Sequence, residues 1–182
     1  YCNGMISNWG THLNDIAQWG NGTEFTGPTS VEGKGEFSKG LWNTIESFEL
    51  KYEYANGVTL EYKNEGPYVE FFGTLGSIKV DYFNGVTASD EELLNLKPSK
   101  DQVSLIDTLS DKEDFLNAIK NNTLTLEPIE VGHRVVSMCQ IGLIAIKLGR
   151  KLNWNPDKEI FINDNAANAM INRPVRGNWL DV

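Results

Sequence analysis

Cysteine and histidine are scarce in this chain of 182 residues, which contains two of each. Cys2 and Cys139 lie far apart and lack the paired C-x-x-C spacing of a zinc site or a thioredoxin-like redox motif. His12 and His133 show neither H-x-x-x-H nor H-E-x-x-H spacing, so we expect no metal site. A disulfide between the two cysteines stays open, but Cys139 lies in the apolar stretch SMCQIGLIAI and is interpreted as a core residue.

Long apolar runs and an excess of basic charge are also missing. No run approaches the roughly 18 to 20 apolar residues of a membrane span, and the first residues, YCNGM, do not resemble a signal peptide. The net charge of -9, from 16 basic and 25 acidic residues, repels phosphate backbones and anionic lipids. We therefore expect neither a nucleic acid nor a membrane as partner.

The length suits a single domain, and with 40% hydrophobic residues the chain can bury a core. The predicted class is α+β, because strand segments are followed by helical ones. Five short segments rich in β-branched and aromatic residues predict strands of an antiparallel meander. These segments are residues 30–37, 46–54, 58–63, 68–73 and 77–83. Asn56-Gly57 predicts a two-residue hairpin turn with positive φ at both positions.

The second predicted strand alternates in a regular way. Phe48, Leu50, Tyr52 and Tyr54 alternate with charged residues, which indicates one covered face and one polar face. The predicted fold is therefore an antiparallel or mixed sheet of about five or six strands, with helices packed on one face.

Four helices are predicted from periodicity and caps. The first covers residues 7–19 and stops at Gly20. Ser110 and Glu113 form a capping box for a helix to about Asn121, with Phe115, Leu116 and Ile119 inward. The longest helix, at 131–148, is apolar on more than one face and is expected to be central. Residues 154–157 are predicted as a turn. Asp164 is predicted as the N-cap of a short helix to about Ile171.

The first helix carries a polar row. At ~100° per residue, Asn8, His12, Asp15 and Trp19 fall within roughly 60° of one another. Such a row suits hydroxyl-bearing ligands, and histidine is the side chain whose ordinary pKa suits proton transfer near neutrality. The alternative from spacing alone is an ordinary surface or interface histidine.

Apolar residues form the neighbouring stripe of this helix. Trp9, Leu13, Ile16 and Ala17 are expected to pack against the rest of the protein. Elsewhere, Trp42 in GLWNT is a candidate for stacking on a sugar ring, because an aromatic face suits the C–H side of a carbohydrate.

The stretch GMISNWGTHLNDIAQW resembles the segment that opens the C-terminal domain of Gfo/Idh/MocA oxidoreductases, which act on sugars and polyols with a nicotinamide cofactor. The family pattern is G-x-x-x-D-x-G-x-H-x-x-D. Gly4, Gly10, His12 and Asp15 match it, while Asn8 stands where the family usually has aspartate. FFGTLGSI and EVGHRVVSMCQIGLIAIKLGRKLNWNP resemble later parts of the same domain, so the resemblance covers nearly the whole chain.

The resemblance implies specific roles. His12 would be the acid/base that takes a proton from a substrate hydroxyl while hydride leaves for the nicotinamide, and Asn8 would orient the histidine or the substrate. An amide donates and accepts hydrogen bonds but lacks the negative charge that stabilises imidazolium. Asp15, three residues from His12, is the candidate to supply that charge, and with Trp42 it is expected to bind substrate.

The resemblance also implies a fold like the C-terminal domains of dihydrodipicolinate reductase and glyceraldehyde-3-phosphate dehydrogenase. In that fold the open sheet face makes dimer or tetramer contacts, which agrees with the many aromatic residues on the predicted strands. We therefore expect a homo-oligomer formed through the open face.

The family's nucleotide-binding half, with its GxGxxG turn and lysine, has no counterpart here. The glycine clusters at 20–25 and 33–38 lack the third glycine and are interpreted as loops. Residues 1–182 are therefore expected to be a single substrate-binding and oligomerisation domain of a longer two-domain enzyme. NAD or NADP would be bound mainly by the absent N-terminal domain, and no cofactor is expected in this fragment, which would be inactive alone.

Two function classes follow. The first is the substrate-binding domain of a NAD(P)-dependent oxidoreductase acting on a sugar or polyol, by dehydrogenation or by redox-neutral chemistry. The second is a non-catalytic ligand-binding or assembly module that keeps the family fold, which the Asn8 departure favours. The substrate, the choice between NAD and NADP, and a cytoplasmic or periplasmic location all stay open.

Overall fold

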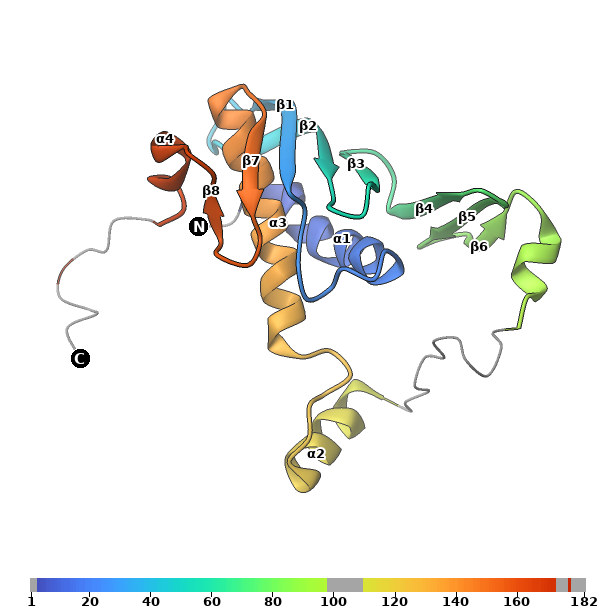
Figure 1. The fold of residues 1–182 in the computed structure, drawn as a ribbon. Coiled ribbons are helices and arrows are strands. Elements are labelled where there is room, and N and C mark those ends of the chain that lie inside the picture. Colours follow the sequence, from blue (N-terminus) through green and yellow to red (C-terminus); the bar gives the residue numbers. More distant parts are fainter. Residues whose placement is uncertain (1–2, 98–109, 173–176, 178–182) are drawn as a thin grey trace. The chain divides into compact units, whose positions relative to one another are not determined.

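The computed structural model describes residues 3–97, 110–172 and 177 (Figure 1). Contacts divide the chain into two compact units. The first unit comprises residues 1–66 and 134–182, and the second comprises residues 67–133.

The first unit is built on a five-stranded antiparallel sheet in the order β3-β2-β1-β7-β8 (Figure 1). Its strands are β1 (Ser30–Phe37), β2 (Ile45–Glu53), β3 (Thr59–Lys63), β7 (Leu152–Asn155) and β8 (Ile160–Phe161). The predicted α+β fold is confirmed, but the single meander is wrong because the fourth and fifth predicted strands lie in a separate sheet. The turn predicted at 154–157 is also wrong in part, since Trp154 and Asn155 belong to β7.

The β2–β3 hairpin forms where Asn56-Gly57 predicts it, with a different turn. Gly57 has a φ of 86°, and its amide donates to the Tyr54 carbonyl at 3.0 Å. Asn56 does not share the positive φ. The loop is therefore three residues long, a type I turn followed by glycine in the left-handed region.

The face of β2 that was predicted to be covered is buried. Phe48, Leu50, Tyr52 and Tyr54 are each at most 5% exposed. Opposite them in β1, Gly33 pairs with Leu50 and Gly35 with Phe48. A Cβ at Gly33 would lie 2.7 Å from Leu50 Cδ2, so these glycines make room for large neighbours, and the interpretation of 33–38 as a loop is wrong.

The opposite face of this sheet is charged. Lys34 Nζ lies 3.1 Å from Glu49 Oε2 across β1 and β2, and Glu32 pairs in register with Lys51. The aromatic side chains of β2 face the helices instead, so the aromatic argument for an oligomer face here is wrong. Assembly through this face stays a prediction.

Two helices cover the inner face. They are α1 (Asn8–Gly20), which follows the short turn η1 (Gly4–Ile6), and α3 (Ile129–Leu148). The Tyr52 hydroxyl donates to the Met138 carbonyl of α3 at 3.1 Å, and the Tyr54 hydroxyl donates to Gln18 Oε1 of α1 at 3.3 Å. The predicted helix at 7–19 and the placement of helices on one face are confirmed.

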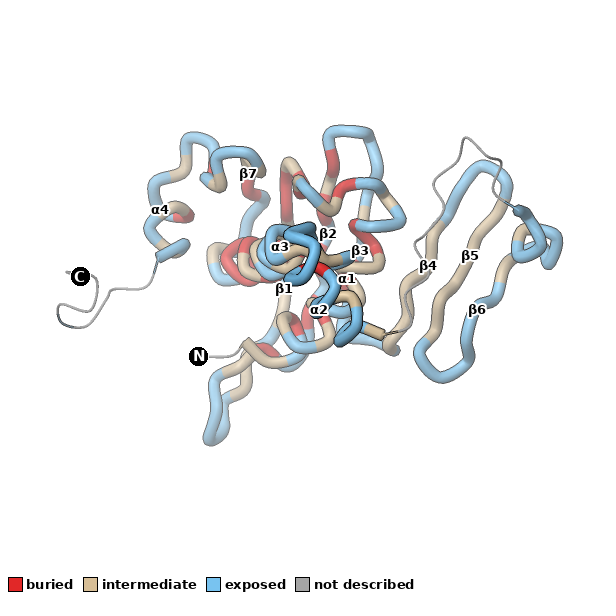
Figure 2. The backbone as a smooth tube through the Cα atoms, turned by 90° about the horizontal axis from the view of Figure 1, so that it is seen from below, coloured by how far each residue is buried: buried red, intermediate tan, exposed pale blue. Residues whose placement is uncertain are grey.

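Helix α3 is the central helix, as predicted. Residues 141–146 are all buried, and Figure 2 shows the buried segments concentrated in this helix and the strands beside it. Among the described residues, α3 alone is long and apolar enough to cross a membrane, and just over half of its apolar window is buried in the protein. Such burial is typical of a core helix of a globular protein.

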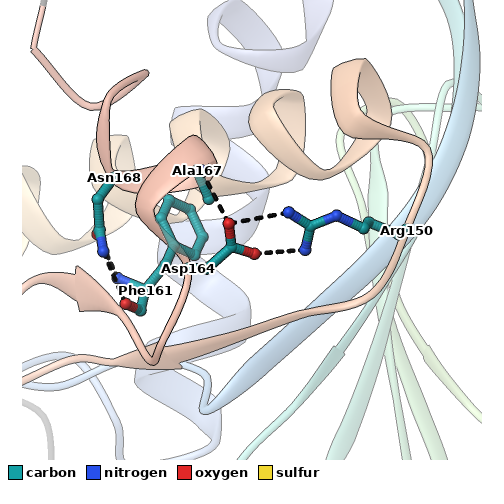
Figure 3. Close-up of polar contacts among 5 residues, drawn as sticks. All are labelled: Arg150, Phe161, Asp164, Ala167 and Asn168. Carbon is teal, nitrogen blue, oxygen red and sulfur yellow. Dashed lines mark hydrogen bonds and ion pairs between the residues drawn. The ribbon is translucent and has the colours of Figure 1, made fainter.

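Side chains of Arg150, Asp164 and Asn168 hold the segment around β8 and the short helix α4 (Asn165–Asn168; Figure 3). Asp164 caps α4 by accepting from the Ala167 amide at 3.0 Å, and Arg150 donates to both of its carboxylate oxygens. Asn168 accepts from the Phe161 amide at 2.7 Å and donates to the Phe161 carbonyl at 2.8 Å. This amide occupies part of the free sheet edge.

The second unit contains a three-stranded antiparallel sheet in the order β4-β5-β6. Its strands are β4 (Tyr68–Gly73), β5 (Gly76–Asp81) and β6 (Gly85–Ala88), followed by the short helix η2 (Glu91–Asn95). One face carries Val69, Phe71, Ile78 and Val80 in register. On the other face, Lys79 Nζ lies 3.9 Å above the Tyr68 ring centroid. No residue of this sheet is fully buried (Figure 2).

Helix α2 (Asp111–Asn121) has the capping box that its sequence predicts. Ser110 Oγ accepts from the Glu113 amide at 3.1 Å. The predicted inward face is wrong, because Phe115, Leu116 and Ile119 are each more than half exposed. Helical periodicity finds an amphipathic face but does not supply its partner.

Two glycines of α3 provide a matched test of packing. A Cβ at Gly142 would overlap the Tyr52 hydroxyl and lie 2.8 Å from Leu50 Cδ1, whereas no described atom lies within 4 Å of a Cβ at Gly132. We expect Gly142→Ala to lower the free energy of unfolding by about 1–3 kcal/mol through overpacking. Gly132→Ala should raise it by up to about 1 kcal/mol through helix propensity. Urea unfolding measures both, and equal stability of the two variants would contradict this packing.

The ion pair in Figure 3 predicts a pH dependence. Hydrogen bonds from Arg150 and then from the Ala167 amide lower the pKa of Asp164 from 3.8 to about 2. The stabilisation by this carboxylate should therefore be complete above pH 3.8 and be lost as the pH falls through about 2. Arg150→Ala should raise the pKa of Asp164 toward its ordinary value, as measured by an NMR titration. Lys147→Ala is the control and should leave this pKa unchanged. An unchanged pKa of Asp164 in Arg150→Ala would refute the pairing.

Candidate active site

The predicted polar row lies on the open side of α1. Asn8 and His12 are exposed, and Asp15 is half-buried one turn further along the helix. Trp19, at the end of the row, is 47% exposed. The structure therefore brings these four residues together on one side of one helix, as the spacing predicts.

The buried face of α1 differs from the predicted one. Its buried residues are Gly10, Asn14, Ala17 and Gln18. Of the predicted apolar stripe Ala17 is buried, whereas Trp9, Leu13 and Ile16 are half-buried. The reason is the close approach of α1 to its neighbours at Gly10. A Cβ at this position would lie 2.7 Å from the Tyr62 hydroxyl oxygen and 3.0 Å from Cys139 Sγ. The face of the helix with the smallest residue therefore packs most deeply.

Polar atoms hold this buried face. Asn14 Nδ2 donates to Cys139 Sγ at 3.6 Å, and Gln18 Oε1 accepts from the Tyr54 hydroxyl. Buried polar groups are costly unless they are paired, so these contacts favour one rotation of α1 about its axis. Gln18 Nε2 is buried without a hydrogen-bond partner in the described structure.

Cys139 takes no part in chemistry here. It is a free, buried thiol, as predicted for a core residue. Burial raises the pKa of Cys139 to about 11, which keeps it protonated and unreactive near neutrality.

His12 has an aromatic neighbour and an acidic neighbour. The rings of Trp9 and His12 meet edge to face with centroids 5.8 Å apart. Burial and the nearby Glu24 carboxylate raise the pKa of Asp15, while His12 lowers it. Asp15 follows His12 by three residues on α1, the spacing at which side chains of one helix are neighbours.

Sequence reasoning missed Glu24. It lies after the end of α1, in a turn where the Thr23 amide and hydroxyl both donate to the Gln18 carbonyl, at 2.8 and 3.2 Å. The helix stripe gives no signal for a residue outside the helix. The one available signal was a lone carboxylate directly after a glycine-rich stop, GNGTE.

Trp42 comes from a different segment, the loop between β1 and β2, and is 58% exposed. The end of this loop lies beside η1, where the Cβ position of Gly4 is 3.3 Å from Thr44 Cβ. The loop thus approaches the segment that leads into α1 at Thr44, and this contact does not bring Trp42 itself to the polar row.

The described residues include neither a metal-ligating cluster nor a glycine turn of the dinucleotide-binding kind. Residues 3–97 and 110–172 contain no group of three or more His, Cys, Asp or Glu able to hold a metal ion. Gly20 is the last residue of α1 and Gly22 follows the helix, while Gly33 and Gly35 lie within β1. Neither cluster leads from a strand into a helix, so neither fits a dinucleotide pyrophosphate.

Comparison with known proteins identifies the family. Residues 1–181 match the model of the oxidoreductase family, C-terminal alpha/beta domain. The chain belongs to the Gfo/Idh/MocA oxidoreductases. No curated protein matches it.

Solved structures share the fold at low identity. GenD2 from gentamicin A biosynthesis, solved with NAD, has a TM-score of 0.61 and 13% identity over 84% of this chain and 48% of its own. An aldose-aldose oxidoreductase from Caulobacter crescentus, complexed with glycerol, has a TM-score of 0.58 and 13% identity over 79% and 45%. A NAD-binding protein from Listeria innocua has a TM-score of 0.55 and 16% identity over 82% and 51%. The chain spans about half the length of these proteins.

The proximity of His12 and Asp15 is testable. Because His12 lowers the pKa of Asp15, we expect His12→Ala to raise that pKa further, most clearly where the imidazole is protonated. An NMR titration of the Asp15 carboxyl carbon measures the shift. Glu36→Gln, on the charged sheet face, is the control, and a pKa of Asp15 that is the same in His12→Ala as in the wild type would show that the two groups do not interact.

Proposed function

We propose that this chain is the substrate-binding part of a NAD(P)-dependent oxidoreductase that acts on a sugar or polyol. The family supports the oxidoreductase class. Two similar structures, one complexed with glycerol and one with NAD, support the substrate and cofactor classes.

The observation that carries the proposal is the polar row on α1. A helix anchored by its buried face presents His12 between Asn8 and Asp15 on its open side. In the proposed reaction His12 accepts the proton of a substrate hydroxyl. Asp15 stabilises the resulting imidazolium, and Asn8 hydrogen-bonds the substrate or the histidine.

Nucleotide binding is assigned to the remainder of a longer protein. The described residues offer no glycine turn at a helix N-terminus, so no step through the nucleotide is derived for them. By this proposal the 182-residue chain is inactive alone.

Asn8 favours a second candidate. A neutral amide at this position removes one negative charge beside His12. The alternative is a non-catalytic ligand-binding or assembly module, in which α1 is retained for packing and the polar row binds a ligand without proton transfer.

Variants of the complete protein test the choice. We expect His12→Ala to lower kcat/KM for a sugar or polyol by about 10²- to 10⁴-fold, the usual contribution of a general base. Trp42→Ala should raise KM more than it lowers kcat, because a stacking residue binds substrate and transition state alike. Nicotinamide absorbance measures turnover, and Glu36→Gln is the control.

Two results would support the module instead. One is undiminished turnover in His12→Ala. The other is a complete protein that reduces neither NAD nor NADP with any sugar or polyol.

A further inference from the structure

The Tyr62 hydroxyl joins strand β3 to the segment that leads into the candidate site. It donates to the Met5 carbonyl of η1 at 3.1 Å, with the Ile6 carbonyl as a second acceptor at 3.4 Å. Tyr62 is 6% exposed, and its ring packs edge to face on Phe48 with centroids 4.8 Å apart. Because the ring is held by packing, the hydroxyl fixes the position of η1, which leads through Ser7 into α1.

The same hydroxyl contacts α1 itself at Gly10. A Cβ at Gly10 would lie 2.7 Å from the Tyr62 oxygen, so there is no room for a side chain between the helix backbone and this oxygen. Gly10 comes two residues before His12, and at ~100° per residue the two point to nearly opposite sides of the helix. The structure agrees, because Gly10 is buried and His12 is exposed. Tyr62 therefore supports α1 behind the side that carries His12.

Tyr52 makes the corresponding contacts with the other helix. Its hydroxyl donates to the Met138 carbonyl of α3 at 3.1 Å and would overlap a Cβ at Gly142. Tyr52 is also buried. Each tyrosine thus combines a buried hydroxyl, a carbonyl acceptor in a helical segment and a closely packed glycine. Helix α3 carries no residue of the polar row, so Tyr52 is a matched comparison for Tyr62.

We infer that Tyr62 is a positioning residue for His12, because its hydroxyl holds η1 and the first half of α1 against the sheet and thereby sets where the imidazole lies. The catalytic part of this role rests on the function proposed above. A general base acts only within hydrogen-bond reach of the proton that it removes, and a misplacement of about 1 Å can lower the rate by about 10²-fold. Loss of the Tyr62 hydroxyl removes this support without changing any group of the polar row.

The experiment compares Tyr62→Phe with Tyr52→Phe in the complete protein. Each change removes one buried hydroxyl and keeps the ring, so both variants should lose stability in urea unfolding. Only Tyr62→Phe should move the NMR signals of the His12 imidazole, which are assigned as those missing from His12→Ala. With a sugar or polyol as substrate, Tyr62→Phe should lower kcat by about tenfold while KM changes by less than about twofold. Equal effects of the two variants on the His12 signals and on kcat would overturn the positioning role.

Gly10→Ala tests the contact from the helix side. The added methyl group meets the Tyr62 oxygen at 2.7 Å and Cys139 Sγ at 3.0 Å, so α1 should be displaced and the His12 signals should move. Removal of the oxygen by Tyr62→Phe leaves the ring carbon Cζ, 3.3 Å away, as the nearest atom of that side chain. The stability lost through Gly10→Ala should therefore be smaller in the Tyr62→Phe background than in the wild type, and additive losses would contradict the contact. If Gly10→Ala does not fold, the two tyrosine variants still decide the question.

The positioning role and the proposed function fail separately. If sugars or polyols are oxidised and Tyr62→Phe leaves kcat and the His12 signals as they are in Tyr52→Phe, the positioning role is refuted while the proposed function stands. If no sugar or polyol reduces the nucleotide, the proposed function falls and the catalytic part of the role falls with it. In that case a shift of the His12 signals confined to Tyr62→Phe supports the anchoring of α1, and its absence refutes that anchoring.

Discussion

The close approach of two helices to one sheet is the constraint on which the first unit depends. Two glycines allow this close approach, because a side chain at either position would overlap a neighbour. Gly10 packs against Tyr62 and Cys139, and Gly142 packs against Tyr52. Tyrosine hydroxyls on the inner sheet face then reach helix carbonyls and amides. Burial raises the pKa of these tyrosines above the ordinary value, so they stay neutral donors.

This contact decides which side of α1 faces outward. In one rotation of the helix, Asn14 reaches Cys139 of α3 and Gln18 reaches Tyr54, directly after β2. A helix turned so that Trp9, Leu13 and Ile16 pack most deeply would leave both amides without those partners. The exposure of His12 is thus a consequence of buried polar contacts, since the same rotation that pairs the amides turns the polar row outward.

The second unit shows the opposite situation. The residues on the apolar face of its sheet are half-buried, and Phe115, Leu116 and Ile119 on one side of α2 are each more than half exposed. Apolar patches of this kind are typical of surfaces that other protein segments contact. Nothing among the described residues identifies that segment, and the charged outer face of the first sheet does not share this apolar character.

Local sequence patterns were enough to predict the elements with strong local chemistry. The helix at α1, the capping box of α2, the hairpin at Asn56-Gly57 and the alternation in β2 all follow from local spacing, and the His12 motif located the candidate site within the family pattern. Contacts between distant segments determine which face of α1 is buried, that β7 joins β1 across more than a hundred residues, and that β4 and β5 form their own sheet. Local patterns fix what a short segment prefers, whereas these outcomes depend on partners distant in the chain, whose shape and polar atoms no local period encodes.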